Sequence, residues 1–243
     1  MSVLTEARCT VLAWDSAFFG LRIGRFEMER PSADDAERAT AWARAQRLDC
    51  LYALIEATHV PSIRALEREG FSLADVRLTL ERSTRTASAV PRPCDISEAA
   101  AGDRDALMAV ARRSHVGTRF TDEPRFGARA AELYAEWVRA ALGEEDAITL
   151  VPRVAGRACG YLTLHGVSAP EARVGVFAVE EAQRGRGIGQ ALVAEALGCL
   201  ATRGARRLAV VTHGRNAAAV RFYERCGFQA RSCQLWYHRW FTP

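Results

Sequence analysis

Glycine and arginine residues crowd one short turn of the sequence, where a strand pattern ends and a helix pattern begins. The strand pattern covers Val174–Val179, and glycines at positions 185, 187 and 189 precede an amphipathic helix. The first backbone N–H groups of a helix have no partner within it and lie at the positive end of its dipole. Glycine lets an anion approach these groups, and Arg184 and Arg186 add charge that suits phosphate. The turn therefore predicts a pyrophosphate-binding loop.

A second helix pattern places an asparagine and a tyrosine on one face. Asn216 and Tyr223 are seven residues apart, about two turns of helix, and Gly227 ends the pattern. Asparagine at the first position is typical of a helix N-cap. The tyrosine suits either a core position with a satisfied hydroxyl or proton transfer, since a phenol with a reference pKa of about 10 protonates a thiolate at modest cost.

The elements that must position these residues follow from the spacing of apolar side chains in residues 94–243. Alternating helices and strands are typical of a mixed α/β layer. We expect Asp103 to cap the first helix, and the almost wholly apolar strand Val174–Val179 to be buried on both faces. The pattern predicts helices at 103–114, 130–142, 188–200 and 216–226, a hairpin at 148–154 and 161–164, and strands at 174–179, 208–212 and 235–240.

One composition break divides the chain. Pro91 and Pro93 lie in a small, polar stretch, and proline interrupts both helices and central strands. We therefore predict a linker at residues 86–93, between a domain at residues 1–85 and a domain at residues 94–243.

The first half contains a partial echo of the second. A shift of 157 positions aligns Leu51–Arg82 with Leu208–Arg239, and both copies show strand, helix, Gly-Phe corner and strand. The first copy has His59 in the place of Asn216 and Leu66 in the place of Tyr223, and it lacks the glycine turn. Residues 1–85 are therefore predicted to be a truncated copy that does not bind the pyrophosphate.

The composition excludes several functions. The chain of 243 residues contains no lysine, which excludes a Walker A phosphate loop and a pyridoxal Schiff base. The seven cysteines are scattered, without C-x-x-C or H-x-x-x-H spacing, so we expect reduced thiols and no metal site. The net charge of +4 is a mild excess that does not indicate a nucleic-acid partner. No stretch approaches the roughly 18 apolar residues of a membrane span, and Met1–Arg8 lacks a signal-peptide core, so a soluble, cytoplasmic protein is expected.

Two motifs together resemble those of the GNAT superfamily of N-acetyltransferases. Arg184–Gly189 fits R-x-x-G-x-G, and Asn216–Phe228 fits N-x-x-A-x-x-x-Y-x-x-x-G-F. The resemblance implies an α/β GNAT fold, with a mixed, mostly antiparallel sheet flanked by helices, preceded by a truncated GNAT-like N-terminal domain. It also implies acetyl-CoA as the cofactor. The residues that it assigns to coenzyme A are Phe177, Ala178, Val179, Arg184, Gly185, Arg186, Gly187, Ile188, Gly189, Gln190, Asn216 and Phe222.

The resemblance also implies direct acetyl transfer to an amine, with Tyr223 as general acid. It assigns the pantetheine arm and the thioester oxygen to the backbone of Phe177, Ala178 and Val179. The base is harder to assign, because the strand before the glycine turn carries no carboxylate. Several N-terminal segments are similar to the TDP-fucosamine acetyltransferase type, in which a carboxylate just after the Gly-Phe corner is the proposed base. Asp75 matches it, with Glu56 or water as alternatives. The segments are Leu12–Gly20, Gly70–Asp75, Ser114–Phe120 and Leu133–Val138.

The same resemblance implies an amino-sugar acceptor, such as a TDP-linked 4-amino-4,6-dideoxyhexose. Arg119 and Phe120 are candidates to bind its nucleotide, by phosphate contacts and by stacking, with loop charge and core packing as the alternative. Two alternatives remain open. One is acetylation of another small amine or of a peptide N-terminus, and the other is a coenzyme A-binding sensor without turnover. The aromatic residues of the last strand suit either a partner subunit, which would make a homodimer, or core packing. Alternation places Trp236, His238 and Trp240 on one side of that strand and Tyr237 on the other.

Overall fold

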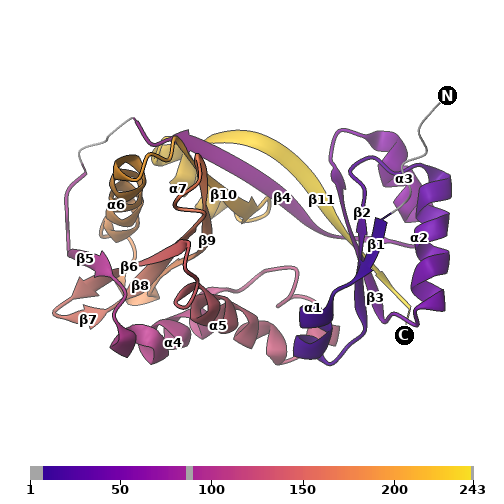
Figure 1. Ribbon diagram of the computed structural model, residues 1–243, viewed down its shortest axis with the longest axis horizontal. Helices are drawn as coiled ribbons and strands as arrows, with labels where there is room; N and C mark the ends of the chain where they lie inside the picture. Colours follow the sequence, from indigo (N-terminus) through magenta and orange to yellow (C-terminus); the bar gives the residue numbers. More distant parts are fainter. Residues whose placement is uncertain (1–7, 86–89, 242–243) are drawn as a thin grey trace. The chain divides into compact units, whose positions relative to one another are not determined.

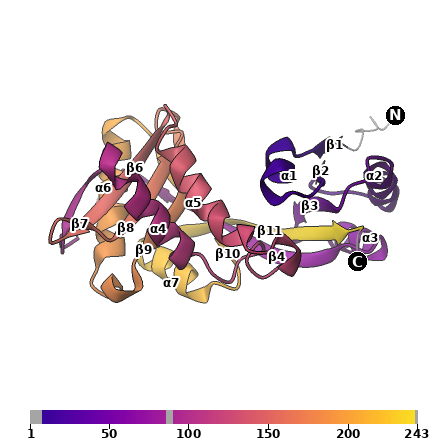
Figure 2. The ribbon, with the colours of Figure 1, turned by 90° about the horizontal axis from the view of Figure 1, so that it is seen from below.

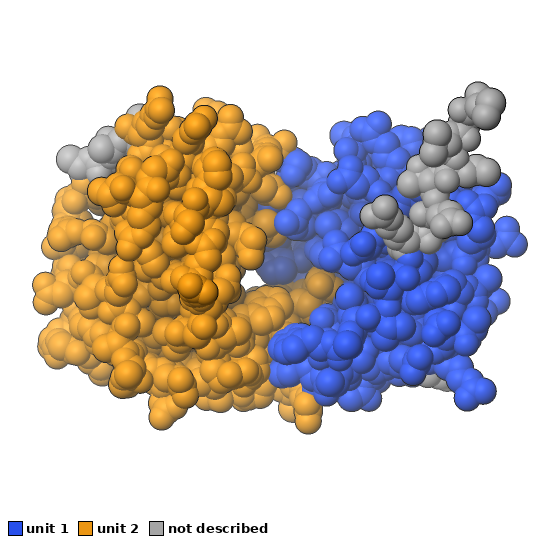
Figure 3. Space-filling view, in the orientation of Figure 1, with its two compact units in different colours: residues 1–78, 213–215, 232–243 blue, residues 79–212, 216–231 orange. Residues whose placement is uncertain are grey.

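The computed structural model describes residues 8–85 and 90–241 (Figure 1). The chain forms two compact units, shown in different colours in Figure 3. Unit 1 comprises residues 1–78, 213–215 and 232–243, and unit 2 comprises residues 79–212 and 216–231. Two long strands, β4 (Ser72–Ser83) and β11 (Gln229–Trp240), each contribute residues to both units. Helices flank β-sheet in each unit, which confirms the predicted α/β class.

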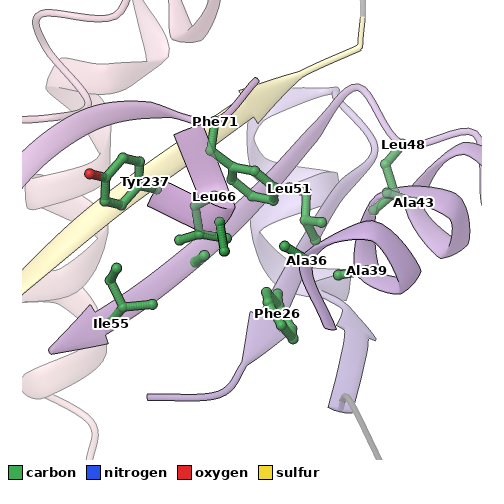
Figure 4. Close-up of a cluster of buried hydrophobic side chains, with 12 residues drawn as sticks. Phe26, Ala36, Ala39, Ala43, Leu48, Leu51, Ile55, Leu66, Phe71 and Tyr237 are labelled. Carbon is green, nitrogen blue, oxygen red and sulfur yellow. The ribbon is translucent and has the colours of Figure 1, made fainter. Parts of the chain in front are cut away.

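In unit 1, two helices cover one face of a small sheet. The strands lie in the order β1 (Arg8–Val11), β2 (Ile23–Glu27), β3 (Cys50–Glu56) and β11, with β2 and β3 parallel and the other neighbours antiparallel. A short helix, α1 (Ala13–Phe19), connects β1 to β2. The helices α2 (Ala33–Ala45) and α3 (Val60–Arg68) pack on the sheet through a buried apolar cluster that includes Phe26, Leu51, Leu66, Phe71 and Tyr237 (Figure 4).

In unit 2, helices cover both faces of the sheet. Two of them, α4 (Arg104–Ser114) and α5 (Arg129–Ala141), lie side by side on one face, and α6 (Ile188–Thr202) lies on the other (Figures 1 and 2). Helix α7 (Ala217–Arg225) precedes β11. Short 3-10 helices are η1 (Ala101–Asp103), η2 (Pro124–Phe126) and η3 (Glu181–Gln183). The strands lie in the order β4, β10 (Arg207–His213), β9 (Glu171–Val179), β8 (Gly160–His165), β6 (Ala147–Val154) and β5 (Asp95–Glu98), with β7 (Arg157–Ala158) paired to β6.

The internal echo is confirmed element by element. Strand β10 begins and ends 157 residues after β3, helix α7 does so after α3, and strand β11 does so after β4. Both Gly-Phe corners contain a glycine in the left-handed conformation, with φ of 78° at Gly70 and 79° at Gly227. The two copies therefore share a strand–helix–strand unit of the same length.

The last strand of each copy completes the sheet of the other copy. Strand β11 pairs with β3, and β4 lies beside β10. The Arg239 guanidinium of β11 lies against Gly70, and the Arg82 guanidinium of β4 donates to the carbonyl of Cys226 beside Gly227. This exchange is the reason that the compact units do not coincide with the predicted segments 1–85 and 94–243. Part of the predicted linker, residues 86–89, lies outside the described residues.

Three local expectations are wrong. Strand β9 is not buried on both faces, because buried Val174 and Val176 alternate with exposed Arg173 and Gly175. Asp103 occupies the N-cap position of α4, but its side chain accepts no hydrogen bond from that helix. Its carboxylate accepts hydrogen bonds from the Ala100 N–H and from the Arg153 guanidinium. The last strand begins at residue 229 rather than 235, because its polar first residues also lie in the sheet.

The seven cysteines all lie in the described residues and are free. Burial raises the pKa of Cys9 to about 11, so this thiol stays protonated at neutral pH. Within residues 8–85 and 90–241, no helix combines the length and apolar character needed to cross a membrane.

Candidate active site

The glycine turn leaves the start of α6 open to an anion. Gly185 and Gly187 have φ of 76° and 80°, in the left-handed region that favours glycine. Gly187 is the N-cap of α6, and its carbonyl accepts the first intrahelical hydrogen bond, from the Ala191 N–H at 3.0 Å. No side chain caps the helix, and its first turn contains no acidic residue. The N–H groups of residues 188–190 therefore point out of a helix end with positive potential.

Two guanidinium groups lie in the same turn. Arg184 donates from Nε to the carbonyl of Val179 at 3.1 Å, and Arg186 donates to Oε1 of Gln183 at 2.7 Å. Both side chains are exposed, and neither forms an ion pair with a carboxylate of the described residues. Their charge is therefore available to a phosphate group, as the sequence predicts.

Strand β9 offers an open edge just before this turn. Its pairing with β10 ends at Val174–Val210, whereas its pairing with β8 continues to Val179–Gly160. On the β8 side, the Val176 N–H donates to Oγ1 of Thr163 at 2.9 Å, and the Glu180 N–H donates to the carbonyl of Cys159 at 2.8 Å.

The alternation of strand backbone groups decides which residues use that edge. Because Val176 and Glu180 direct their N–H groups towards β8, the N–H groups of Phe177 and Val179 point to the opposite side. Ala178 shares the direction of Val176. Of the three residues that the sequence assigns to the cofactor, Phe177 and Val179 are therefore the ones placed to donate to an extended amide chain.

Helix α7 brings three of the predicted site residues together. Oδ1 of Asn216 accepts a hydrogen bond from the Ala219 N–H at 3.0 Å, which confirms the N-cap. Two turns later, the ring of Tyr223 is 5.1 Å from that of Phe222 and 6.5 Å from that of Phe177 on β9, between centroids. Tyr223 is buried, and this burial raises its pKa above the ordinary value of a phenol.

Asp75 occupies a different setting, on the unit 1 part of β4. Its side chain is only 2% exposed. Oδ1 accepts a hydrogen bond from the Val76 N–H at 2.8 Å, and Oδ2 accepts one from Nδ1 of His213. The sequence analysis overlooked His213, although it lies directly ahead of the Asn216 segment, because its partner is 138 residues away in the chain.

The remaining predicted site residues are engaged in packing or ion pairs. Glu56 accepts two hydrogen bonds from Arg30, at 2.8 and 2.5 Å. The guanidinium of Arg119 lies 4.0 Å from the centroid of the Phe120 ring. Phe120 is buried against Phe126, which favours core packing over stacking on a nucleotide.

The side chains of β11 alternate between the two faces of the unit 1 sheet, as predicted. The ring of Tyr52 lies 6.4 Å from Trp236 and 4.6 Å from His238 on one face of the unit 1 sheet. Tyr237 points to the other face, where it belongs to the buried cluster and its hydroxyl donates to Glu67 at 3.2 Å. The expectation that this strand meets a partner subunit stays a prediction.

Comparison with known proteins places these features in a family context. The family model described as acetyltransferase (GNAT) matches residues 111–228, which include the glycine turn and α7. The dTDP-fucosamine acetyltransferase of Escherichia coli O6:H1 is 30% identical over 236 residues, covering 94% of this chain and 96% of that protein. The spore coat polysaccharide biosynthesis protein SpsD of Bacillus subtilis is 32% identical over 141 residues, covering 57% of this chain and 48% of that protein.

Solved structures are similar over nearly the whole chain. A GCN5-related N-acetyltransferase from Sphaerobacter thermophilus matches 98% of this chain and 78% of its own, with a TM-score of 0.72 and 16% identity. A tandem GNAT protein from the clavulanic acid biosynthesis pathway matches 92% of this chain and 77% of its own, with a TM-score of 0.62 and 14% identity. These similarities show the fold.

Proposed function

Because this chain belongs to the GNAT acetyltransferase family, we propose that it transfers the acetyl group of acetyl-CoA to the primary amine of a nucleotide-linked amino sugar. One observation carries the proposal most directly. Unit 2 combines an open strand edge on β9, an uncapped helix start at α6 and a buried tyrosine on α7. The similarity to a dTDP-fucosamine acetyltransferase over 94% of the chain supports the acceptor class.

The residues of unit 2 fit coenzyme A along its length. The N–H groups at the start of α6, with Arg184 and Arg186, suit the pyrophosphate. The N–H groups of Phe177 and Val179 suit the amide groups of the pantetheine arm. When bound, acetyl-CoA supplies an acetyl group activated as a thioester.

Tyr223 is the proposed general acid. The reference pKa of a phenol, about 10, lies above that of a thiol, about 8.5, so proton transfer to a leaving thiolate is modestly uphill in water. Burial raises the pKa of Tyr223, and the same surroundings raise the basicity of a thiolate. The cost of the transfer therefore stays modest, while Tyr223 keeps its proton at neutral pH. The N–H groups of Phe177 and Val179 are the candidate donors to the acetyl oxygen.

Unit 1 contains an arginine pair that suits an anionic acceptor. The Arg25 guanidinium lies 5.7 Å from the ring centroid of Trp236, and Arg77 donates to Oε1 of Gln234 at 2.5 Å. Burial and the nearby charge of Arg25 lower the pKa of Arg77. Such a pair is stabilised by a diphosphate group, and an arginine beside an aromatic ring suits a nucleotide. Arg25 also forms an ion pair with Glu27, with Nε and Oε1 3.6 Å apart, and Arg119 stays the candidate for the nucleotide of the acceptor.

A thiol-release assay over a panel of amines tests the proposal. The panel contains TDP-linked amino sugars, free amino sugars, aminoglycosides, polyamines and short peptides, each with acetyl-CoA. We expect turnover with the TDP-linked amino sugars. Turnover on peptides or polyamines alone would exclude the acceptor class and leave the coenzyme A site in place. Binding of acetyl-CoA without turnover on any amine would instead support a sensor.

A further inference from the structure

Strand β9 contains a β-bulge at the point where it parts from β10. One residue of β8, Thr163, lies opposite two residues of β9, Gly175 and Val176. The register pairs on either side of the bulge are Leu162–Phe177 and Leu164–Val174. All of these residues belong to unit 2. The bulge follows directly after the last pair between β9 and β10, Val174–Val210, so it lies at the start of the open edge.

The bulge determines which face of the sheet receives the Phe177 side chain. Leu162 and Leu164 are two residues apart on β8 and point to the same face. Their partners, Phe177 and Val174, share that face although they are three residues apart. An unbroken strand would place them on opposite faces. The extra residue therefore directs the Phe177 ring towards α7, where it lies 5.5 Å from the ring of Phe222, between centroids.

The hydroxyl of Thr163 completes the backbone hydrogen bonding of the bulge. Oγ1 accepts a hydrogen bond from the Val176 N–H at 2.9 Å, in the place where a regular ladder would offer a carbonyl. Thr163 is fully buried, so without this oxygen the Val176 N–H would lose its partner in the interior. The next N–H along the strand is that of Phe177, which points away from β8 to the open edge.

Gly175 makes room for two side chains of β8. A Cβ atom at this position would lie 2.7 Å from Oγ1 of Thr163 and 2.6 Å from Cδ2 of His165. Any larger residue would therefore displace both side chains from the bulge. The imidazole of His165 occupies this space and packs on the backbone of β9.

A chain of hydrogen bonds orients the Thr163 hydroxyl. Oε2 of Glu144 lies 2.8 Å from Nδ1 of His165, and Nε2 of His165 lies 3.2 Å from Oγ1 of Thr163. An ionised carboxylate only accepts hydrogen bonds, so Nδ1 carries the imidazole proton and Nε2 keeps its lone pair. The Thr163 O–H then donates to Nε2, which is closer than the Val176 carbonyl oxygen at 3.4 Å. This orientation leaves the lone pairs of Oγ1 to the Val176 N–H.

We propose that Thr163 is a positioning residue for the acetyl transfer, an inference that rests on the proposed function. Its hydroxyl, oriented by His165, holds the bulge that presents the Phe177 N–H to the acetyl oxygen, where negative charge develops. Without the hydroxyl, the bulge is free to shift along β9 and to take the Phe177 N–H with it. A displacement of about 1 Å in such a donor can cost about 10²-fold in rate.

Two substitutions at Thr163 and one at His165 test the role in steady-state kinetics. Thr163→Val keeps the shape of the side chain and removes the hydroxyl, so kcat should fall by about 10- to 100-fold. The Kd for coenzyme A in calorimetry should change by less than about threefold, because the start of α6 is unaltered. Thr163→Ser should restore kcat to within about threefold of wild type. His165→Phe keeps a ring over Gly175 without its nitrogens and should lower kcat less than Thr163→Val.

Thr149→Val is the matched control. Thr149 lies on β6 and pairs directly with Thr163, and it is also buried. Within residues 8–85 and 90–241, its Oγ1 has no hydrogen-bond partner. This variant should keep wild-type kcat. An equal loss of kcat in Thr149→Val and Thr163→Val would show an effect of packing alone and would overturn the proposal.

An infrared measurement distinguishes this inference from the proposed function, because it needs no turnover. The protein binds acetyl-CoA that is isotope-labelled at its thioester carbonyl, without an acceptor, and the carbonyl stretching frequency is recorded. A hydrogen bond to the carbonyl oxygen lowers this frequency, so it should be lower in wild type and Thr163→Ser than in Thr163→Val. Equal frequencies in wild type and Thr163→Val would overturn the role of Thr163. Wild-type protein that releases no thiol with any amine would instead refute the proposed function, and the frequencies would still decide the role of Thr163.

Discussion

The substitution Tyr223→Phe separates the chemical role of this side chain from its structural role. The ring packs against Phe222, Phe177 and Phe228, with a centroid distance of 5.4 Å to the last. Phenylalanine keeps all three contacts and removes only the hydroxyl. If the hydroxyl protonates the leaving thiolate, the variant should fold normally and turn over slowly.

The surroundings of the Tyr223 ring determine how much the substitution should change the free energy of unfolding and kcat. The described residues give the Tyr223 hydroxyl no hydrogen bond, so its loss should change the free energy of unfolding by less than about 1 kcal/mol. Loss of a general acid should lower kcat by about 10²- to 10⁴-fold, which corresponds to about 2.7–5.4 kcal/mol of activation free energy. The catalytic effect therefore exceeds the effect on stability.

The assay compares kcat, the KM for acetyl-CoA and urea denaturation for wild type, Tyr223→Phe and Tyr237→Phe. Tyr237 is a buried tyrosine of the apolar cluster in unit 1 and serves as the control, so its variant should keep wild-type kcat. Burial raises the pKa of Tyr223, so wild-type kcat should show no alkaline decline from this group below about pH 10. A Tyr223→Phe kcat within threefold of wild type would refute the general-acid role.

Three further predictions concern the elements around the site. Asn216→Ala removes the cap of α7 and should lower the free energy of unfolding by about 0.5–2 kcal/mol, measured by urea denaturation; an unchanged midpoint would contradict it. Gly187→Ala should cost about 1–2 kcal/mol and weaken coenzyme A binding in calorimetry, whereas Gly204→Ala, with φ of 84° beyond the other end of α6, should reduce stability alone. The Arg153 guanidinium holds the pKa of Asp103 below its usual range, so the pair stabilises the fold above the unfolded pKa of about 3.9 and loses this contribution as pH falls through the folded pKa. Arg153→Met should therefore destabilise the protein most at neutral pH, and a thermal denaturation deficit that stays constant down to pH 2 would exclude this coupling.

Features encoded within one short segment could be predicted from the sequence. The N-cap at Asn216 and the glycine turn before α6 depend on residue types and their spacing along a few turns of chain. The internal repeat could also be predicted, because both copies keep a Gly-Phe corner at the same place between helix and strand.

Features that depend on distant pairing were not predicted. Periodicity shows that a strand forms but not which strand it joins, so the exchange of β4 and β11 between the two copies was missed. Asp75 was singled out as a candidate base, but its hydrogen-bond partner His213, 138 residues away in the chain, had no signal of its own. Asp103 has the residue type of a cap, yet a bidentate hydrogen bond from Arg153 on β6 competes for its carboxylate.

Acceptor choice in a mixed assay tests the central claim most directly. Wild-type protein is incubated with limiting acetyl-CoA and equal amounts of a TDP-linked 4-amino-4,6-dideoxyhexose, the corresponding free amino sugar and a short peptide with a free N-terminus. Mass spectrometry then identifies which amine carries the acetyl group. We predict acetylation of the nucleotide-linked sugar, in preference to both competitors. Acetylation of the peptide or the free sugar alone, or of none of the three, would contradict the proposed function.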